Sequence, residues 1–198
     1  MREIVFFLEE ESARAMLETL WPKIVGEEAF PRFVVFEGKQ DLQRQLEKKL
    51  RGYLNHNARF IVIRDQDKDE CKKVKRSLQS ICQKAGRPGA IVRIACRELE
   101  SFYLGDLRAV ELGLGVKGIA AKQSKAKYRQ PDKLQTPYAE LSLLTGYRYQ
   151  KIAGSRAIAR HLDLQNPRSD SFRNLLSAIR KCVRVLNSFR ESALRSIE

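Results

Sequence analysis

Short apolar runs and helical stripes alternate along the first half of the chain. Four apolar runs have the length and the β-branched content typical of buried strands: EIVFFL at 3–8, RFVVF at 32–36, RFIVI at 59–63 and AIVRIA at 90–95. Between them, apolar residues recur at helical spacing, over 12–24, 42–53 and 74–82. Strands that alternate with helices predict a mostly parallel sheet with helices on both faces, which is an α/β fold of Rossmann-like type.

The second half of the chain has a different pattern. The strand signal fades after residue 104, and 117–134 is a basic segment, rich in Lys and Gln, that we expect to be a loop. From Tyr149 onward the apolar spacing is helical, with a long stripe that begins at Phe172. We therefore expect an α/β core over 1–105, followed over 106–198 by a basic loop and an α-helical C-terminal region packed on that core.

The charge balance of the chain indicates the kind of partner that it binds. The 198 residues include 38 Lys and Arg against 24 Asp and Glu, a formal net charge of +14. Such a surplus creates a positive field that attracts phosphate backbones, so it favours nucleic acid as the partner. The alternatives are an ordinary basic protein and one that fits an acidic protein partner.

The cellular location follows from cysteine use and hydropathy. The four cysteines show no metal-ligand spacing, which indicates reduced thiols and a cytoplasmic protein. The first residues, MREIVFFLEEES, have too short an apolar run and too many acids for a signal peptide. No stretch is long enough to span a membrane, so we expect a soluble protein that does not use a membrane.

Carboxylates follow two of the predicted strands. Glu9 comes directly after the first strand, and Asp65, Asp67 and Asp69 follow the third. Because parallel strands end at the same edge of a sheet, these acids would meet there, and crowded carboxylates repel unless a cation joins them. The pattern predicts a site for Mg²⁺ (or Mn²⁺). The alternative is a set of solvated turns, in which Glu9 starts one helix and the aspartates cap another.

The fourth strand is followed by RELESFYL, which adds Glu98 and Glu100. If the chain is still extended there, both side chains face the site, and if it is helical only one of them can. Both are therefore candidate metal ligands. The neighbouring Phe102 and Tyr103 are expected in the core rather than as base-stacking platforms.

Two arginines flank the acidic positions. Arg64 precedes Asp65, and Arg97 precedes Glu98. Each is a candidate for holding phosphate, with a plain ion pair to a neighbouring acid as the alternative.

The order of these acidic residues resembles a known arrangement. A Glu after strand one, Asp-x-Asp after strand three and Glu-x-Glu after strand four are similar to a Toprim domain, the metal-binding module of topoisomerases, bacterial primases and nucleases. FLEEES, IRDQDKDE and RELESFYL resemble segments of nucleases of the overcoming-lysogenisation-defect class, over roughly 1–105. RELESFYLGD, YQKIAGSRAIA and SFRNLL are also similar to small bacterial Toprim-like proteins encoded beside an ATPase in phage-defence or mobile loci.

The resemblance implies roles for the acidic residues. Glu9 would be the catalytic glutamate, Asp65 and Asp67 the metal-binding pair, and Glu98 or Glu100 a supplementary ligand. On this basis we expect the fold to be Toprim-like.

Two further positions in the resemblance bear on activity. Lys151 matches a basic residue that could steady a phosphate, and it could equally be one more surface lysine. Glu10 stands where the family has a tight-turn glycine, and a side chain there could crowd the approach of substrate.

The favoured hypothesis is a magnesium-dependent nuclease that hydrolyses DNA or RNA, as the effector subunit of a bacterial anti-phage or mobile-element system. The alternative is a catalytically weak subunit that binds nucleic acid or regulates a partner ATPase. A third hypothesis is a phospho-receiver domain. Cys96 and Arg97 argue against it, because they occupy the position where that fold would place Ser or Thr.

Overall fold

The computed structural model describes the backbone of residues 2–195 and the side chains of residues 2–188. Four strands form a single parallel sheet in the order β2-β1-β3-β4. They span β1 Glu3–Leu8, β2 Phe30–Val35, β3 Arg59–Asp65 and β4 Ile91–Ala95. Each one coincides within a few residues with an apolar run of the sequence, so the predicted α/β fold with a parallel sheet is confirmed.

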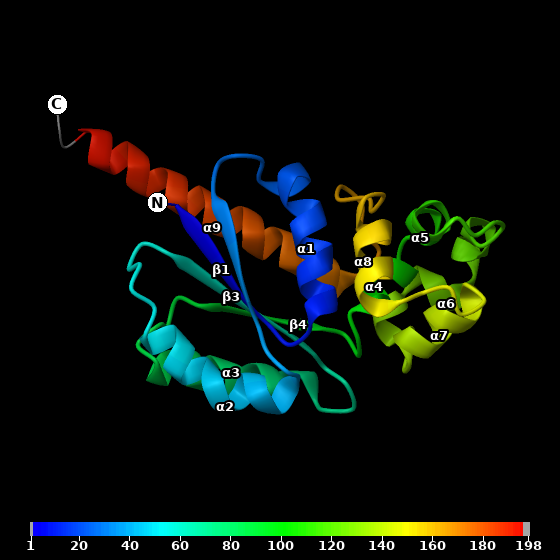
Figure 1. Cartoon of the computed structure of the whole chain (residues 1–198), viewed down its shortest axis with the longest axis horizontal. Coiled ribbons are helices and arrows are strands. Elements are labelled where there is room, and N and C mark those ends of the chain that lie inside the picture. The colour runs from blue at the N-terminus through cyan, green and yellow to red at the C-terminus, as the bar shows by residue number, and fades with distance from the viewer. Residues whose placement is uncertain (1, 196–198) are drawn as a thin grey trace.

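Helices cover both faces of the sheet. The described helices are α1 Glu11–Ile24, α2 Lys39–Arg51, α3 Cys71–Lys84, α4 Glu100–Leu104, α5 Leu107–Leu114, α6 Ala126–Arg129, α7 Pro137–Leu144, α8 Lys151–Ala159 and α9 Asp170–Arg195. Figure 1 shows α2 and α3 on one side of the strands, with α1 and α9 on the other. Successive side chains of β1 point to opposite faces of the sheet. Val5 packs on the α2–α3 side, and Phe6 packs on the α1–α9 side.

The remaining helices group beyond one end of the sheet. Figure 1 shows α4, α5, α6, α7 and α8 together at the end toward which the strands run. Close packing between two of them depends on Gly113 in α5, where a Cβ atom would lie only 2.8 Å from backbone atoms of Ala157 in α8. This group therefore stands beside the edge where the predicted acidic residues leave the strands.

The C-terminal helix belongs to the same core as the sheet. Buried residues of α9, including Ile179 and Leu186, join β1, α1 and α5 in one hydrophobic cluster. Helix α9 therefore packs on the α/β core and, together with α1, covers one face of the sheet (Figure 1).

Two local features differ from expectation. The basic segment 117–134 is not a plain loop, since it contains α6 and two 3₁₀ turns, Ala120–Ser124 and Pro131–Lys133. The Gln123 side chain fixes it by accepting from the Leu107 N–H and donating to the Tyr128 carbonyl. Helix α1 begins at Glu11, one residue before the helical spacing predicted over 12–24, and the Ser12 hydroxyl donates to the Glu10 carboxylate.

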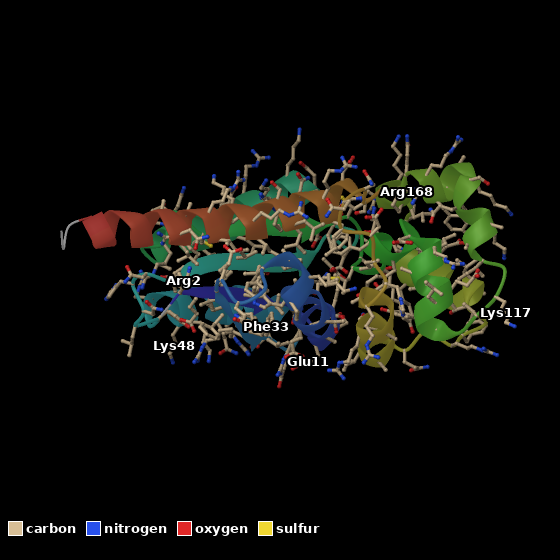
Figure 2. The ribbon with its side chains drawn as sticks, turned by 90° about the horizontal axis from the view of Figure 1, so that it is seen from above. Arg2, Glu11, Phe33, Lys48, Lys117 and Arg168 are labelled. Carbon is tan, nitrogen blue, oxygen red and sulfur yellow. The ribbon has the colours of Figure 1, made fainter. Side chains whose placement is uncertain are left out.

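Charged side chains surround the molecule. Figure 2 shows blue nitrogen tips along most of its outline, with Lys48 and Lys117 toward opposite ends. No helix within the described residues is both long enough and apolar enough to cross a membrane.

Candidate functional site

Glu9 is the first residue after β1, and the flanking strands hold its backbone on both sides. Its N–H donates to the Ile63 carbonyl of β3, and its carbonyl accepts from the Gly38 N–H that follows β2. Glu9 is buried, with 8% of the residue exposed. Because β1 is central in the sheet order, Glu9 points into the middle of the carboxyl edge.

Asp65 ends β3 directly beside Glu9. In the parallel register Leu8 pairs with Ile63, so Glu9 follows opposite Arg64, and Asp65 is one residue farther along β3. The Asp65 backbone N–H donates to Oε2 of Glu9 at 3.2 Å. The structure therefore brings together the two acids that the sequence places after strands one and three.

Arg64 lies beneath this pair. It is 2% exposed, and its Nη2 donates to Asp69 at 2.7 Å. Its Nε lies 3.7 Å from Oε2 of Glu9 and makes no hydrogen bond to any described residue. This buried position fits the ion-pair alternative for Arg64, with Asp69 as its partner, better than contact with an incoming phosphate.

Glu100 is the third acid at the edge. The chain is helical here, since α4 begins at Glu100, so Glu98 and Glu100 point in different directions. Glu100 is 1% exposed and accepts a hydrogen bond from the Tyr149 hydroxyl at 2.9 Å. Ser155 of α8 contacts the same hydroxyl at 3.2 Å. Residues of the C-terminal half thus orient a carboxylate of the α/β core.

Burial and neighbouring carboxylates raise the pKa values of all three acids. Burial, and then the charge of Asp67, raise the pKa of Glu9 from 4.5 to about 7. Burial, followed by the charges of Glu100 and Glu9, raises the pKa of Asp65 well above its usual value. Burial also raises the pKa of Glu100, against the opposing charge of Lys151. A cluster with these shifts favours either protons or a bound cation.

Asp67 is held differently from Asp65. The chain is no longer extended after β3, because Asp67 adopts a left-handed φ of 56°. Its backbone N–H donates to the Arg97 carbonyl at 2.7 Å, and Nη1 of Arg97 donates back to the Asp67 carbonyl at 3.1 Å. The Asp67 carboxylate accepts from Lys39 at 2.9 Å. Asp65 and Asp67 therefore do not project side by side from a strand, and Arg97 clamps the turn.

Glu98 faces the helical group instead of the sheet edge. Its Oε2 accepts the backbone N–H of Tyr138, in the first turn of α7, at 2.6 Å. A carboxylate at a helix N-terminus is stabilised by the unpaired N–H groups there. Of the two glutamates in RELESFYL, Glu100 is thus the one that lies with Glu9 and Asp65.

Lys151 closes the other side of the cluster. Its Nζ lies 2.9 and 3.1 Å from the two carboxylate oxygens of Glu10, and 5.6 Å from the centre of the Tyr138 ring. Burial lowers the pKa of Lys151, but the bond to Glu10 and the charges of Glu100 and Asp65 outweigh that effect and raise it. The lysine is therefore a cation directed at the acidic edge.

The space between the acids is small. Glu9, Arg64, Asp65 and Leu99 line part of a cavity of about 10 Å³, close to the size that admits one water molecule. Within the part of the chain that the structure describes, no three His, Cys, Asp or Glu side chains are grouped so as to hold a metal ion. Much larger hollows, such as one of about 420 Å³ lined by Arg59, lie elsewhere on the molecule.

Sequence reasoning missed several residues of this site. Lys39, Tyr138, Tyr149 and Ser155 support or border the acids, yet none stands out along the chain. Glu10 and Lys151 are 141 positions apart, so only the folded chain shows that they pair. Tyr149, two positions before Lys151 and at the start of a helical pattern, gives a weak local signal.

Comparison with known proteins identifies one family. Residues 8–180 match a family described as Domain of unknown function (DUF4276). No curated protein and no solved structure matches the chain. The matched region begins at the end of β1 and runs into α9, so it includes every residue of the acidic edge and Lys151. The chain belongs to the DUF4276 family.

Proposed function

We propose that this protein is a metal-dependent nuclease that hydrolyses phosphodiester bonds of DNA or RNA. The observation that carries the proposal is the meeting of Glu9, Asp65 and Glu100 at the carboxyl edge of a parallel sheet, inside a chain with net charge +14. Ligands of open α/β sheets bind at this edge. Buried acids that repel one another in an otherwise basic protein favour a cation at this edge, and an anionic polymer beyond it.

The residues present fit Mg²⁺ or Mn²⁺. Magnesium takes one or two carboxylates from a protein and fills its other positions with waters and phosphate oxygens, so a set of three protein ligands is not required. The water-sized cavity beside Glu9 and Asp65, and the Nε of Arg64 that lacks a hydrogen bond, leave room for a bound water there. A bound Mg²⁺ would lower the pKa of such a water and stabilise the leaving oxygen.

The residues of the site have different proposed roles in hydrolysis. Glu9, whose pKa is about 7, suits acceptance of a proton from water near neutral pH. Asp65 is the principal candidate ligand, and Glu100 supports it from a position fixed by Tyr149. Lys151 stands where its charge can hold a phosphate of the substrate.

A catalytically weak subunit is the second candidate, and one contact favours it. The Glu10 carboxylate binds Lys151, so the cation proposed for phosphate is already paired. In that case the protein would present its basic surface to nucleic acid and depend on a partner. An ATPase partner and a place in anti-phage or mobile-element defence are proposals that rest on the resemblance described above.

The deciding experiment is cleavage of labelled single- and double-stranded DNA and RNA with Mg²⁺, Mn²⁺ or EDTA. Wild type is compared with Asp65→Asn and Glu9→Gln, and with Glu47→Gln as a control at a carboxylate on α2 that pairs with Arg51. Each protein is tested alone and with the candidate ATPase. Metal-dependent cutting that only the two site variants lose would support the nuclease, with an expected loss of at least 100-fold.

Wild type that binds nucleic acid but never cuts would contradict the nuclease. Unchanged binding by both site variants would then favour the second candidate.

A further inference from the structure

Tyr138 presents an exposed ring that is fixed relative to the acidic edge. The residue is 41% exposed, although the site holds it at several points. Its backbone N–H donates to Glu98, and its ring centre lies 6.1 Å from that of Tyr149 at an angle of 60°. Tyr149 is buried and donates to Glu100. Tyr149 thus connects the exposed Tyr138 ring to the Glu100 carboxylate of the site.

A cation stands beside the same ring. Nζ of Lys151 is 5.6 Å from the Tyr138 ring centre, and it also binds Glu10, the neighbour of Glu9 in the chain. A phosphate drawn to Lys151 would therefore lie next to an aromatic surface. Proteins that bind single strands combine such charges with rings on which bases stack.

Three other aromatic residues do not meet both conditions. Phe102 and Tyr103, which follow Glu100 in the chain, are 2% and 0% exposed and belong to the core, as their sequence context predicts. Phe30 is 59% exposed, but it begins β2 and pairs with Glu3 at the opposite edge of the sheet. Tyr138 combines exposure with contacts that lead to the site.

We propose that Tyr138 stacks on an unpaired base whose phosphate lies at Lys151, and thereby makes the site selective for single-stranded nucleic acid. This inference rests on the proposed function for the kind of polymer that binds. Inside a duplex, each base is covered on both faces by its neighbours, so a ring can stack on it only after the base leaves the helix. A single strand presents that face at little cost, and every base has one.

The test measures binding without cleavage. Oligonucleotides that carry one 2-aminopurine are titrated in EDTA, as single-stranded DNA, as single-stranded RNA and as a duplex of the same sequence. Stacking on an aromatic ring quenches the fluorescence of the 2-aminopurine. The proteins are wild type, Tyr138→Ala, Tyr138→Leu, Tyr138→Phe and the control Phe30→Ala, each checked for folding by thermal unfolding.

The expected result distinguishes the effect of the aromatic ring on binding from the effects of the Tyr138 hydroxyl and of side-chain size. Wild type, Tyr138→Phe and Phe30→Ala bind single strands equally and quench the probe. Tyr138→Ala and Tyr138→Leu lose roughly 5- to 100-fold in single-strand affinity, together with the quenching, and change duplex binding by less than about twofold. The comparison of DNA with RNA shows which strand is preferred.

Three results would overturn the inference: equal single-strand binding by Tyr138→Ala, equal losses for single strand and duplex, or no single-strand binding by wild type. Failure of the proposed function looks different. Wild type would then bind and quench single strands in the Tyr138-dependent way but cleave nothing when metal is added. Conversely, cleavage of single strands that Tyr138→Ala leaves unchanged would refute the stacking role alone.

Discussion

Replacing Glu9 with Gln should stabilise the metal-free protein at pH 8. Gln keeps an oxygen that can accept the Asp65 N–H, so the local hydrogen bond is retained, but it carries no charge. The wild-type carboxyl is buried near Asp67 and other acids, and its folded-state pKa is raised to about 7. The carboxyl ionises more readily in the unfolded chain than in the folded one. Above the unfolded pKa, this difference lowers the free energy of unfolding.

The size and sign of the effect follow from the two pKa values. Below an unfolded pKa of 4.5 the Glu9 carboxyl is protonated in both states and costs nothing. Between 4.5 and about 7 only the unfolded chain releases the proton, so stability falls as pH rises, and above 7 the loss is complete. At about 1.4 kcal/mol per pH unit, the full loss is about 3 kcal/mol. For a chain of this size that corresponds to roughly 6–12 °C in Tm.

The assay is urea unfolding in EDTA at pH 4.5 and pH 8, with circular dichroism as the readout. Wild type and Glu9→Gln should be similarly stable at pH 4.5, and the variant should be more stable at pH 8. Removal of the Glu9 charge also relieves Asp65, which acts in the same direction. The control Glu47→Gln removes an exposed ion pair and should change stability by less than about 1 kcal/mol at both pH values. A Glu9→Gln variant that is equally or less stable than wild type at pH 8 would refute the reasoning.

Two further predictions concern packing and charge. Gly113→Ala should lower stability by about 1–3 kcal/mol, because the added methyl meets the backbone of α8 at 2.8 Å, whereas Gly89→Ala, which meets nothing within 4 Å, should change it by less than about 0.5 kcal/mol. Thermal unfolding checks this pair, and equal Tm values would contradict the close approach of α5 and α8. Lys151→Gln should lower the salt dependence of nucleic-acid binding by about one unit in the slope of log K against log salt, while Tyr138→Ala should leave the slope unchanged. Titrations at several salt concentrations measure both slopes, and an unchanged slope for Lys151→Gln would exclude its contact with phosphate.

The sequence was sufficient to predict the sheet and the meeting of Glu9 with Asp65, and it left open whether Glu98 or Glu100 joins them. β1 and β3 are apolar on both faces because helices cover both, so their runs stand out, and the residues after them must share one edge. Glu9 and Asp65 meet for that reason. The prediction depends only on strand direction and on where each strand ends.

The rest of the site depends on backbone angles and long-range contacts. The left-handed φ of Asp67 sends its carboxylate to Lys39, and the helical start of α4 separates Glu98 from Glu100. A pattern of residue types does not determine whether the chain stays extended for two more residues. The contacts of Tyr149 with Glu100 and of Lys151 with Glu10 join parts of the chain that share no local signal.

The hydrogen bond from Tyr149 to Glu100 has a consequence for synthesis of the protein. A nascent chain that has emerged only as far as residue 105 already contains Glu9, Asp65 and Glu100, but it lacks the tyrosine that orients Glu100 and the helix α9 that covers one face of the sheet. The orientation of Glu100 beside Glu9 and Asp65 is therefore complete only after Tyr149 and the residues of α9 have left the ribosome. A translation product that stops before Tyr149 would carry the acids without this arrangement, so any activity of the site is delayed until these later residues have been made.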